Sequence, residues 1–373
     1  MKAVMVIVDG LADEKIEELG WQTTFEAARH PELDQIAAGG YTGWFSSCPQ
    51  GYLPESMPCI LNLLGIDPAY FPQSRASLEL LANGYCLEQD EVVLRCNLAA
   101  LDSHGILSSF NGGNLTGPDM EEAAKIAADI DPNIKVLHLS GYRNLIIVKK
   151  HYFQTLDCKT YPPHEFLGGD SDALLADIYA SAPILQKFVS EGKNRLKHLS
   201  SQEQQLMFYP WGISGKSCLP AFAELYSKKA AAVCGAEIAK GIALALKMDV
   251  PELEEATGDT DTDLALKAQT ACRLLSGHDF VLVHINGADE AAHRHDYREK
   301  IEFIERIDRE FFAFLRQNLA NETRILVCAD HATSPVSGKH SALDVPYILR
   351  KAGETFPPGD LEANKALKYL ISE

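Results

Sequence analysis

The sequence has no long apolar run, and this limits the class of protein it can encode. No stretch approaches the ~20 apolar residues that a membrane-spanning helix needs. The N-terminal segment is apolar only from Ala3 to Val8 before Asp9 interrupts it, which is too short for the core of a signal peptide. We therefore expect a cytoplasmic protein whose chain begins with a buried strand.

Closely spaced cysteine pairs are also absent. The nine cysteines are scattered, none lies in a C-x-x-C pair, and their number is odd. This pattern argues against zinc knuckles and against a disulfide scaffold. We expect most of these cysteines to be small buried apolar residues.

Positive charge is scarce. The chain has 34 Lys and Arg against 52 Asp and Glu, which gives a formal net charge of −18. Such a charge argues against nucleic acid and against an anionic membrane as partners. It would also repel a small phosphorylated metabolite, so that local lysines, arginines or metal ions would have to bind one. The sequence does not indicate an oligomeric state.

The alternation of short apolar runs with longer helical patterns predicts an α/β fold. The runs at 3–8, 280–285 and 324–329 are continuously apolar, as buried parallel strands are. Helical patterns occupy 31–40, 261–277 and 298–319. Strands that alternate with helices are typical of a mostly parallel sheet flanked by helices, and 373 residues are enough for two domains.

The middle of the chain predicts a smaller α+β domain inserted into the first. Residues 92–117 contain two strand-like runs joined by "DSHG", and 135–150 contain two more joined by "SGYR". The segment "GGDSDA" at 168–173 offers a helix N-cap where the chain could return to the first domain. We expect the inserted domain to span 95–170 and the core domain to comprise 1–94 and 171–373.

Acidic and imidazole side chains follow the predicted parallel strands. In open α/β sheets, ligands bind at the carboxyl ends of such strands. Three aspartates and three histidines fall at or shortly after these ends: Asp9, Asp289, His293, Asp330, His331 and His340. We expect them to gather at one edge of the sheet.

This set predicts a metal site. Asp289 and His293 are four positions apart, so on a helical turn they share one face. Carboxylate and imidazole ligands together suit Mn²⁺, Zn²⁺ or Fe²⁺ better than Mg²⁺ or Ca²⁺. Six ligands exceed the need of one ion, and paired ions are a common device for phosphoryl transfer. Taken singly, each residue has a plainer interpretation, since Asp9 could be a turn former and "DEAAH" a solvated helix face.

Ser56 is the candidate nucleophile. It lies just before the apolar helical run "CILNLLG", where backbone N–H groups and the helix dipole favour an anion. The alternative is an ordinary N-cap serine.

Several segments together resemble the archaeal type of cofactor-independent phosphoglycerate mutase, a branch of the alkaline phosphatase superfamily. The most specific segments are "VIVDGLAD" (6–13), "ATGDTDTDLALKA" (256–268), "VHINGADEAAHRHDYREKIEFIERID" (283–308) and "ADHATSPVSGKHSALDVPYIL" (329–349). The resemblance extends from residue 1 to about 350. It implies the alkaline-phosphatase-like fold, with an inserted domain that covers the substrate.

The resemblance also implies roles for individual residues. One metal ion would be held by Asp289, His293 and His340, and the other by Asp9, Ser56, Asp330 and His331. Mn²⁺ is the first expectation, with Zn²⁺ or Co²⁺ as alternatives. Ser56 would carry the phosphoryl group transiently, and Lys240 in "AEIAKG" would contact it. Arg143 and Arg95 of the inserted domain would bind the substrate, and Arg75 is a further candidate for this role.

The chain departs from the family pattern beside these residues. Met57 stands where the family has an aspartate after the nucleophile, and "SSFNGG" (108–113) replaces a segment with an acid and an arginine. The leading expectation is interconversion of 2- and 3-phosphoglycerate. The alternatives are a phosphatase or phosphotransferase that acts on another small phosphorylated metabolite, as in homoserine kinase-like chains, and a non-catalytic metal-binding descendant.

Overall fold

The computed structural model describes residues 2–113, 115–201, 203–351 and 361–372. It divides into two compact units. The core unit comprises Met1–Phe71 and Cys218–Glu373, and the inserted unit comprises Pro72–Ser217. Both borders of the inserted unit lie outside the expected range of 95–170. The reason is that helix α4 (Ala76–Ala82) and strand β7 (Gln205–Ser214) both pack on strand β3 (Glu91–Leu101).

The core unit is built on a six-stranded sheet in the order β2-β13-β10-β1-β9-β8. The strands are β1 (Ala3–Val8), β2 (Tyr41–Phe45), β8 (Ala230–Val233), β9 (Phe280–Ile285), β10 (Arg324–Cys328) and β13 (Val345–Arg350). Strands β10, β1, β9 and β8 are parallel. Strand β13 runs antiparallel to β10, and the edge strand β2 runs antiparallel to β13. Strands β1 and β9 are buried on both faces, which explains why they are apolar without alternation. The three predicted parallel strands are confirmed.

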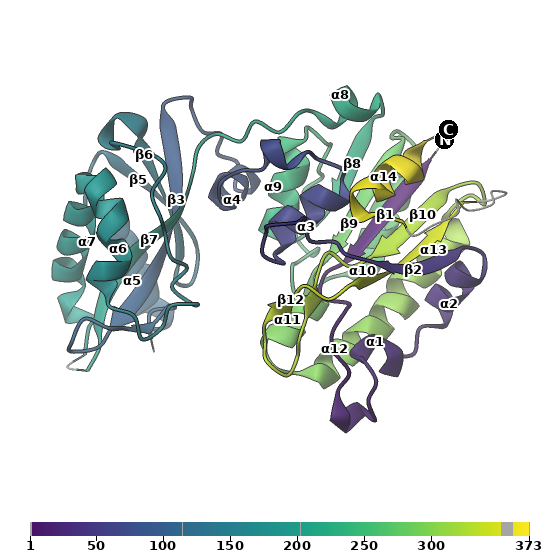
Figure 1. Cartoon of the computed structure of the whole chain (residues 1–373), viewed down its shortest axis with the longest axis horizontal. Helices are drawn as coiled ribbons and strands as arrows, with labels where there is room; N and C mark the ends of the chain where they lie inside the picture. The colour runs from purple at the N-terminus through teal and green to yellow at the C-terminus, as the bar shows by residue number, and fades with distance from the viewer. Residues whose placement is uncertain (1, 114, 202, 352–360, 373) are drawn as a thin grey trace. The chain divides into compact units, whose positions relative to one another are not determined.

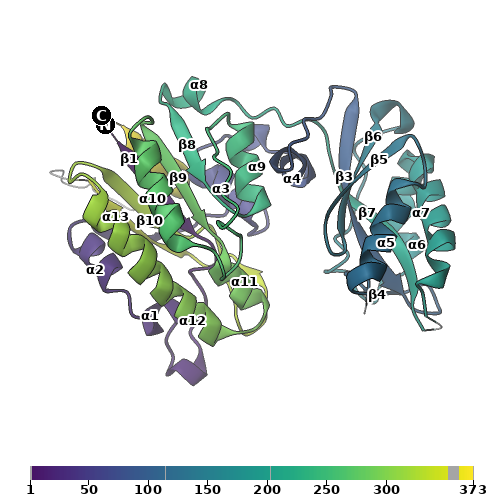
Figure 2. The same ribbon diagram turned by 180° about the vertical axis from the view of Figure 1, so that it is seen from behind.

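Helices cover both faces of the core sheet. Figure 2 shows one face, covered by α2 (Pro31–Ala38), α10 (Leu264–Leu275), α12 (Tyr297–Arg306) and α13 (Ala313–Asn318). The opposite face carries α14 (Ala363–Ile371), which lies in front of the strands in Figure 1. Helix α14 contacts α3 (Ser56–Leu63), and α3 in turn contacts α9 (Glu237–Ala245). The shorter elements of this unit are α1 (Thr24–Ala27), α8 (Phe222–Tyr226), α11 (Gly287–His293), β11 (Ala332–Thr333) and β12 (His340–Ser341).

The three predicted core helices are present, with one interruption. The region 298–319 is helical, but residues Ile307–Phe312 form a π-helical turn between α12 and α13. Within this turn, the Asp308 carboxylate accepts hydrogen bonds from the backbone N–H groups of Glu32 (3.1 Å) and Leu33 (2.8 Å). It thereby caps the N-terminus of α2, whose own N-cap residue makes no such bond. No described helix is both long and apolar enough to cross a lipid bilayer.

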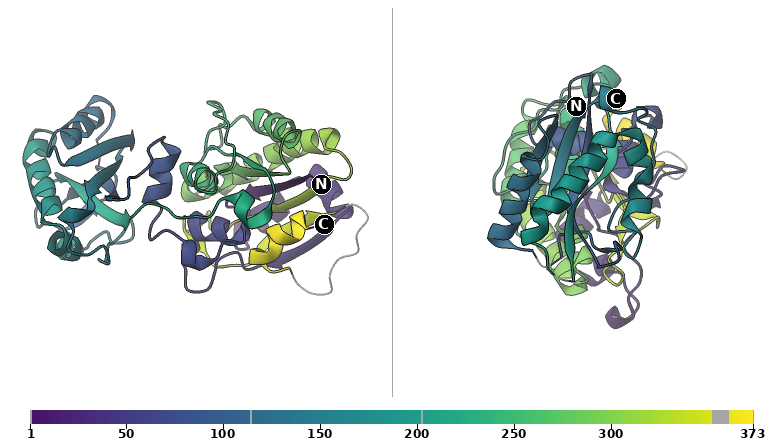
Figure 3. Two further views of the ribbon diagram at one scale, coloured as in Figure 1. Left: turned by 90° about the horizontal axis from the view of Figure 1, so that it is seen from above. Right: turned by 90° about the vertical axis from the view of Figure 1, so that its left-hand side faces the viewer.

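The inserted unit is a five-stranded antiparallel sheet with helices on it. Its strands are β3, β4 (Leu107–Ser109), β5 (Ile134–Ser140), β6 (Arg143–Lys149) and β7, in the order β4-β3-β6-β5 with β7 also paired to β3. Three helices, α5 (Gly117–Ala128), α6 (Ser171–Ser181) and α7 (Pro183–Arg195), cover one face (Figure 3, right, in front of the strands). In the first half of β3, successive residues alternate between the two faces, so that Leu94 packs toward these helices and Val93 toward α4.

Both predicted hairpins of the inserted unit form. In the first, the Asp102 carboxylate accepts hydrogen bonds from the backbone N–H groups of His104 (2.8 Å) and Ile106 (2.9 Å), which fixes the turn between β3 and β4. In the second, Gly141 at φ +53° links β5 to β6. The segment after Asp170 does begin a helix, with Asp170 as the N-cap of α6, but the chain stays in the inserted unit there.

The expectation that most cysteines are buried is wrong. Three of the nine (Cys59, Cys96 and Cys328) are buried, four are half-buried and two are exposed.

Candidate active site

Three neighbouring parallel strands deliver aspartates to one edge of the core sheet. Asp9 directly follows β1, Asp330 lies two residues beyond β10, and Asp289 lies on α11, which begins two residues after β9. Gly10 permits their close approach: its φ is +70°, and a Cβ on it would lie 2.6 Å from the Asp289 Cα. A side chain at position 10 would therefore push α11 away from β1.

Asp289 lies among two of the predicted histidines. Its Oδ2 atom is 3.2 Å from the Nε2 atom of His293, and its Oδ1 atom is 3.4 Å from the Nε2 atom of His340. The two Nε2 atoms are 3.0 Å apart. The Nδ1 atom of His293 donates to the carbonyl of Gly338 at 2.8 Å, so Nε2 is the ring nitrogen that faces this group. Two imidazoles and a carboxylate that converge in this way suit a cation.

A second group forms around His331. Its Nε2 atom lies 3.2 Å from the Oγ atom of Ser56, 3.4 Å from Asp9 and 3.6 Å from Asp330. Asp9, Asp330 and His331 are almost completely buried. Ser56 is the first residue of α3, whose N-cap is Glu55, so the Ser56 hydroxyl faces His331 instead of capping the helix.

The structure also shows one residue that sequence reasoning missed. His284, in β9, is completely buried, and its Nε2 atom is 3.4 Å from the Oδ2 atom of Asp9. Ligand atoms of Asp9, His284 and Asp330 lie within 4.8 Å of one another, as do those of Asp289, His331 and His340. The only sequence signal for His284 is an imidazole inside the otherwise apolar run "FVLVHI".

The second group has buried polar atoms that a metal ion would satisfy. Among the described residues, both carboxylate oxygens of Asp9, both of Asp330 and both ring nitrogens of His284 are buried without a hydrogen-bond partner. Such groups are costly to bury, and two adjacent carboxylates repel each other. A divalent cation would satisfy both requirements, and the mixture of oxygen and nitrogen donors matches Mn²⁺, Zn²⁺ or Co²⁺.

The electrostatics of the site agree with this interpretation. Burial raises the pKa of Asp9 well above its ordinary value, and the carboxylates of Asp330 and Asp289 raise it further. Burial would also raise the pKa of Asp289, but the imidazoles of His293 and His340 outweigh it and hold that pKa well below the ordinary value. Burial lowers the pKa of His284 to about 4, so this imidazole is neutral and able to bind a metal at pH 7.

The remaining predicted residues lie in other surroundings. Lys240 is on α9, and within the described part of the chain its ammonium group pairs with Glu252 at 2.9 Å, not with the Asp and His groups. In the inserted unit, Arg75 and Arg95 both bind the buried carboxylate of Glu79, at 2.7 and 3.1 Å. Arg143 is exposed at the start of β6 and donates to Ser140 at 2.8 Å.

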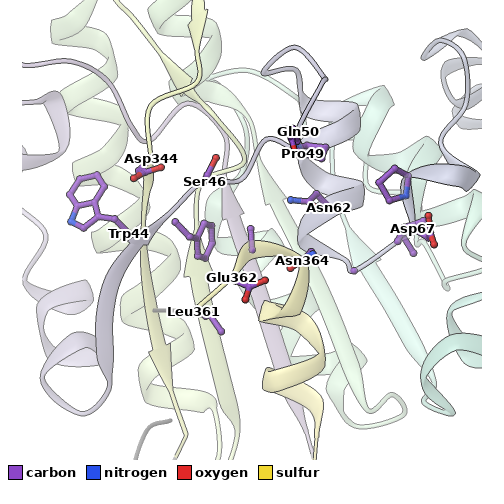
Figure 4. Close-up of a pocket in the computed structure, with 15 residues that line it drawn as sticks. Trp44, Ser46, Pro49, Gln50, Asn62, Asp67, Asp344, Leu361, Glu362 and Asn364 are labelled. Carbon is purple, nitrogen blue, oxygen red and sulfur yellow. The ribbon is translucent and has the colours of Figure 1, made fainter. Parts of the chain in front are cut away.

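A separate cavity of about 810 Å³ lies at the other end of α3 (Figure 4). Its lining includes Asn62 from α3 and the exposed ring of Trp44 from β2. Three carboxylates also line it: Asp67, Asp344 and Glu362. This acidic lining would repel a phosphorylated compound, so we do not assign the chemistry to it.

Comparisons with known proteins bear on the whole chain. The family model described as the metalloenzyme superfamily matches residues 1–367. A 2,3-bisphosphoglycerate-independent phosphoglycerate mutase from Methanosarcina acetivorans is 32% identical, and the match covers 96% of this chain and 93% of that protein. A protein of the same name from Methanothrix thermoacetophila is 30% identical over 95% of this chain and 91% of its own length.

Two solved structures share the fold. A protein from Pyrococcus horikoshii has a TM-score of 0.77 at 22% identity, and the match covers 99% of this chain and 96% of that one. A cofactor-independent phosphoglycerate mutase from Thermoplasma acidophilum has a TM-score of 0.62 at 21% identity, with 100% and 99% covered. The predicted alkaline-phosphatase-like α/β fold and the family resemblance are thereby confirmed. The chain belongs to the metalloenzyme superfamily and, within it, to the archaeal family of 2,3-bisphosphoglycerate-independent phosphoglycerate mutases.

Proposed function

We propose that the protein interconverts 2- and 3-phosphoglycerate by metal-dependent phosphoryl transfer through a phosphorylated Ser56. The observation that carries the proposal is the 3.2 Å approach of the Ser56 hydroxyl to His331, beside two buried aspartates without hydrogen-bond partners. The names of the relatives support the choice of substrate.

Two divalent ions would be held at this edge of the sheet. Asp289, His293 and His340 would hold one ion; Asp9, Ser56, Asp330 and His331 would hold the other. When bound, such ions act as Lewis acids that lower the pKa of a serine hydroxyl and neutralise phosphoryl oxygens. The identity of the ions is part of the proposal, with Mn²⁺ first and Zn²⁺ or Co²⁺ as alternatives.

In the first half-reaction, the Ser56 oxygen bonds to phosphorus while the ester bond of the substrate breaks. The serine proton ends on the leaving oxygen, so that the product of this step is glycerate with both hydroxyl groups free. In the second half-reaction, the other hydroxyl takes the phosphoryl group and returns the proton to Ser56. Glycerate has to stay bound between the two steps, because water would otherwise hydrolyse the phosphoserine.

Cationic side chains are needed to bind an anionic substrate to a chain of charge −18. Arg143, Arg95 and Arg75 are our candidates for this role, and Lys240 is our candidate for contact with the phosphoryl group. Arg143 is the most suitable of the arginines, since its exposed guanidinium is held only by a serine hydroxyl among the described contacts.

A second candidate function is hydrolysis or transfer of phosphate on another small metabolite. Met57, the second residue of α3, is buried beside Ser56 at a position where the family pattern has an aspartate. Because Met57 alters the surroundings of Ser56, the phosphoryl group could be passed to an acceptor other than glycerate.

One experiment separates these functions. Mn²⁺-loaded protein is incubated with 3-phosphoglycerate and, separately, with phosphohomoserine, and the ³¹P NMR spectrum is followed with time. We expect the signal of 2-phosphoglycerate to grow at constant total ester. Inorganic phosphate as the sole product would support the second function, and an unchanged spectrum with 3-phosphoglycerate would contradict the proposed mutase activity.

A further inference from the structure

One hydroxyl group lies between the two candidate metal groups. The Oγ1 atom of Thr333 is 2.6 Å from the Oδ1 atom of Asp289 and 3.1 Å from the Nδ1 atom of His331. Thr333 itself is completely buried, so no water competes for these bonds. It therefore touches one residue from each metal group.

The number of available hydrogen atoms fixes which group donates in the Thr333–Asp289 and Thr333–His331 hydrogen bonds. A threonine hydroxyl has one hydrogen, and an ionised carboxylate can only accept. The hydroxyl hydrogen therefore goes to Asp289, and the hydroxyl oxygen accepts from the Nδ1–H group of His331. A neutral imidazole with its hydrogen on Nδ1 has its lone pair on Nε2. That nitrogen is the one that lies 3.2 Å from the Ser56 hydroxyl.

The backbone of Thr333 is held on three sides. Its N–H group donates to the carbonyl of Ala12 at 2.9 Å, and its carbonyl accepts from the ammonium group of Lys300 at 2.9 Å. In the β11–β12 pair, Thr333 stands opposite His340. Because its side chain is β-branched, it has few rotamers at this fixed position.

We propose that Thr333 is a positioning residue that couples the two metal groups. Its hydroxyl selects the Nδ1–H form of His331 and orients the Asp289 carboxylate, so that one side chain prepares a ligand of each ion. The inference rests on the proposed two-metal function. It goes beyond that function because it assigns a role to a residue that contacts neither substrate nor metal.

The test compares Thr333→Val, which keeps the shape without the hydroxyl, with Thr333→Ser, which keeps the hydroxyl. Metal-free proteins are titrated with Mn²⁺ in a calorimeter. We expect two ions per wild-type chain, and an affinity about 10–100-fold weaker at both sites in Thr333→Val, as is usual when a partner of a metal ligand is lost. We expect Thr333→Ser to stay within about threefold of wild type, since it makes the same two hydrogen bonds.

The outcomes distinguish the two proposals. Wild-type affinity in Thr333→Val, with two ions bound, would overturn the role of Thr333 and leave the proposed function intact. A wild-type chain that binds no Mn²⁺ would overturn both.

A second measurement uses the wild-type protein and so does not depend on whether Thr333→Val folds. Long-range ¹H–¹⁵N NMR on metal-free wild type reports the tautomer of each histidine, and His331→Gln identifies the signal of His331. We expect the hydrogen on Nδ1. A hydrogen on Nε2 would overturn the proposal.

Discussion

Lys300 and Asp13 form an ion pair of 2.7 Å in which both side chains are completely buried. Asp13 also accepts a hydrogen bond from the backbone N–H of Thr24 at 2.9 Å, and Lys300 donates to the carbonyl of Thr333. The pair therefore ties α12 and the start of α1 to the strand that bears Thr333. Burial lowers the pKa of Lys300, and the nearby Asp13 carboxylate acts in the opposite direction.

We predict that Lys300→Met destabilises the protein by about 3–5 kcal/mol, because it leaves the Asp13 carboxylate buried without its cation. Urea unfolding of metal-free protein measures the effect. Lys365→Met is the matched control: Lys365 also pairs with a carboxylate at 2.7 Å, but both side chains are exposed. The control should be nearly neutral. An equal loss of unfolding free energy in the two variants would contradict the argument that burial makes the Lys300–Asp13 pair important for stability.

We predict that Ser56→Ala abolishes turnover of phosphoglycerate while the metal content stays near two ions per chain. The carboxylate and imidazole ligands remain in that variant, but the nucleophile is gone. Metal analysis and a coupled assay on the same sample measure both quantities. Ser276→Ala, on the exposed end of α10, is the control and should keep full activity. Activity of Ser56→Ala close to that of wild type would refute a phosphoserine intermediate.

Removal of metal should abolish activity and lower thermal stability. Ions that bind only the folded chain stabilise it, by about 2.7 kcal/mol per site at a free concentration of 100 times Kd. Chelator-treated protein should regain both activity and melting temperature with Mn²⁺ or Co²⁺, and less with Mg²⁺, which prefers oxygen ligands. Full activity in a sample shown to be metal-free would end the metal hypothesis.

His284→Phe should weaken one metal site and spare the other. The imidazole of His284 faces Asp9 and Asp330. Asp289, in contrast, lies beside His293 and His340. Calorimetric titration with Mn²⁺ should show one site weakened by about 10–100-fold and one unchanged. His104→Phe, an exposed substitution in the inserted unit, serves as the control. Two unchanged sites in His284→Phe would mean that this histidine only fills space.

Asp259 should stabilise the protein at neutral pH but not at low pH. Burial raises the pKa of this carboxyl, but a two-pronged contact with Arg294 (2.9 and 3.0 Å) outweighs it and lowers the pKa below its ordinary value. A carboxylate with a lowered folded-state pKa contributes its full stability above the unfolded pKa of about 3.9, and loses it as the pH falls through the folded value. Asp259→Asn should therefore destabilise at pH 7, and its effect should shrink as the pH falls through the folded-state pKa of Asp259. A pH-independent difference in urea unfolding would contradict this assignment.

Much of the core unit followed from local patterns. Asp9 and Asp330 could be placed together because continuous apolar runs predict parallel strands, and the carboxyl ends of parallel strands meet at one edge. His284 could not be found in this way, because its neighbours in β9 are all apolar and its partner Asp9 is 275 positions distant along the chain. Its role depends on the register in which Ile7 stands opposite His284.

The inserted unit shows the opposite case. Its hairpins were predictable, since each has its turn residues within a few positions. Its extent was not, because β7 pairs with β3 across about 100 residues and no turn joins them. The pairing of Arg75 and Arg95 with Glu79 depends on the packing of α4 against β3, which no spacing in the sequence indicates.

The contact of Gly10 with the backbone of Asp289 has a consequence for how such a centre can change. Asp9, which follows β1, and Asp289, on α11, can lie close together because residue 10 carries only a hydrogen atom in place of a side chain. Even the methyl group of an alanine at position 10 would push Asp289 away from Asp9, although no ligand would be replaced. The spacing between the ligands on β1 and on α11 thus depends on Gly10, which is not itself a ligand.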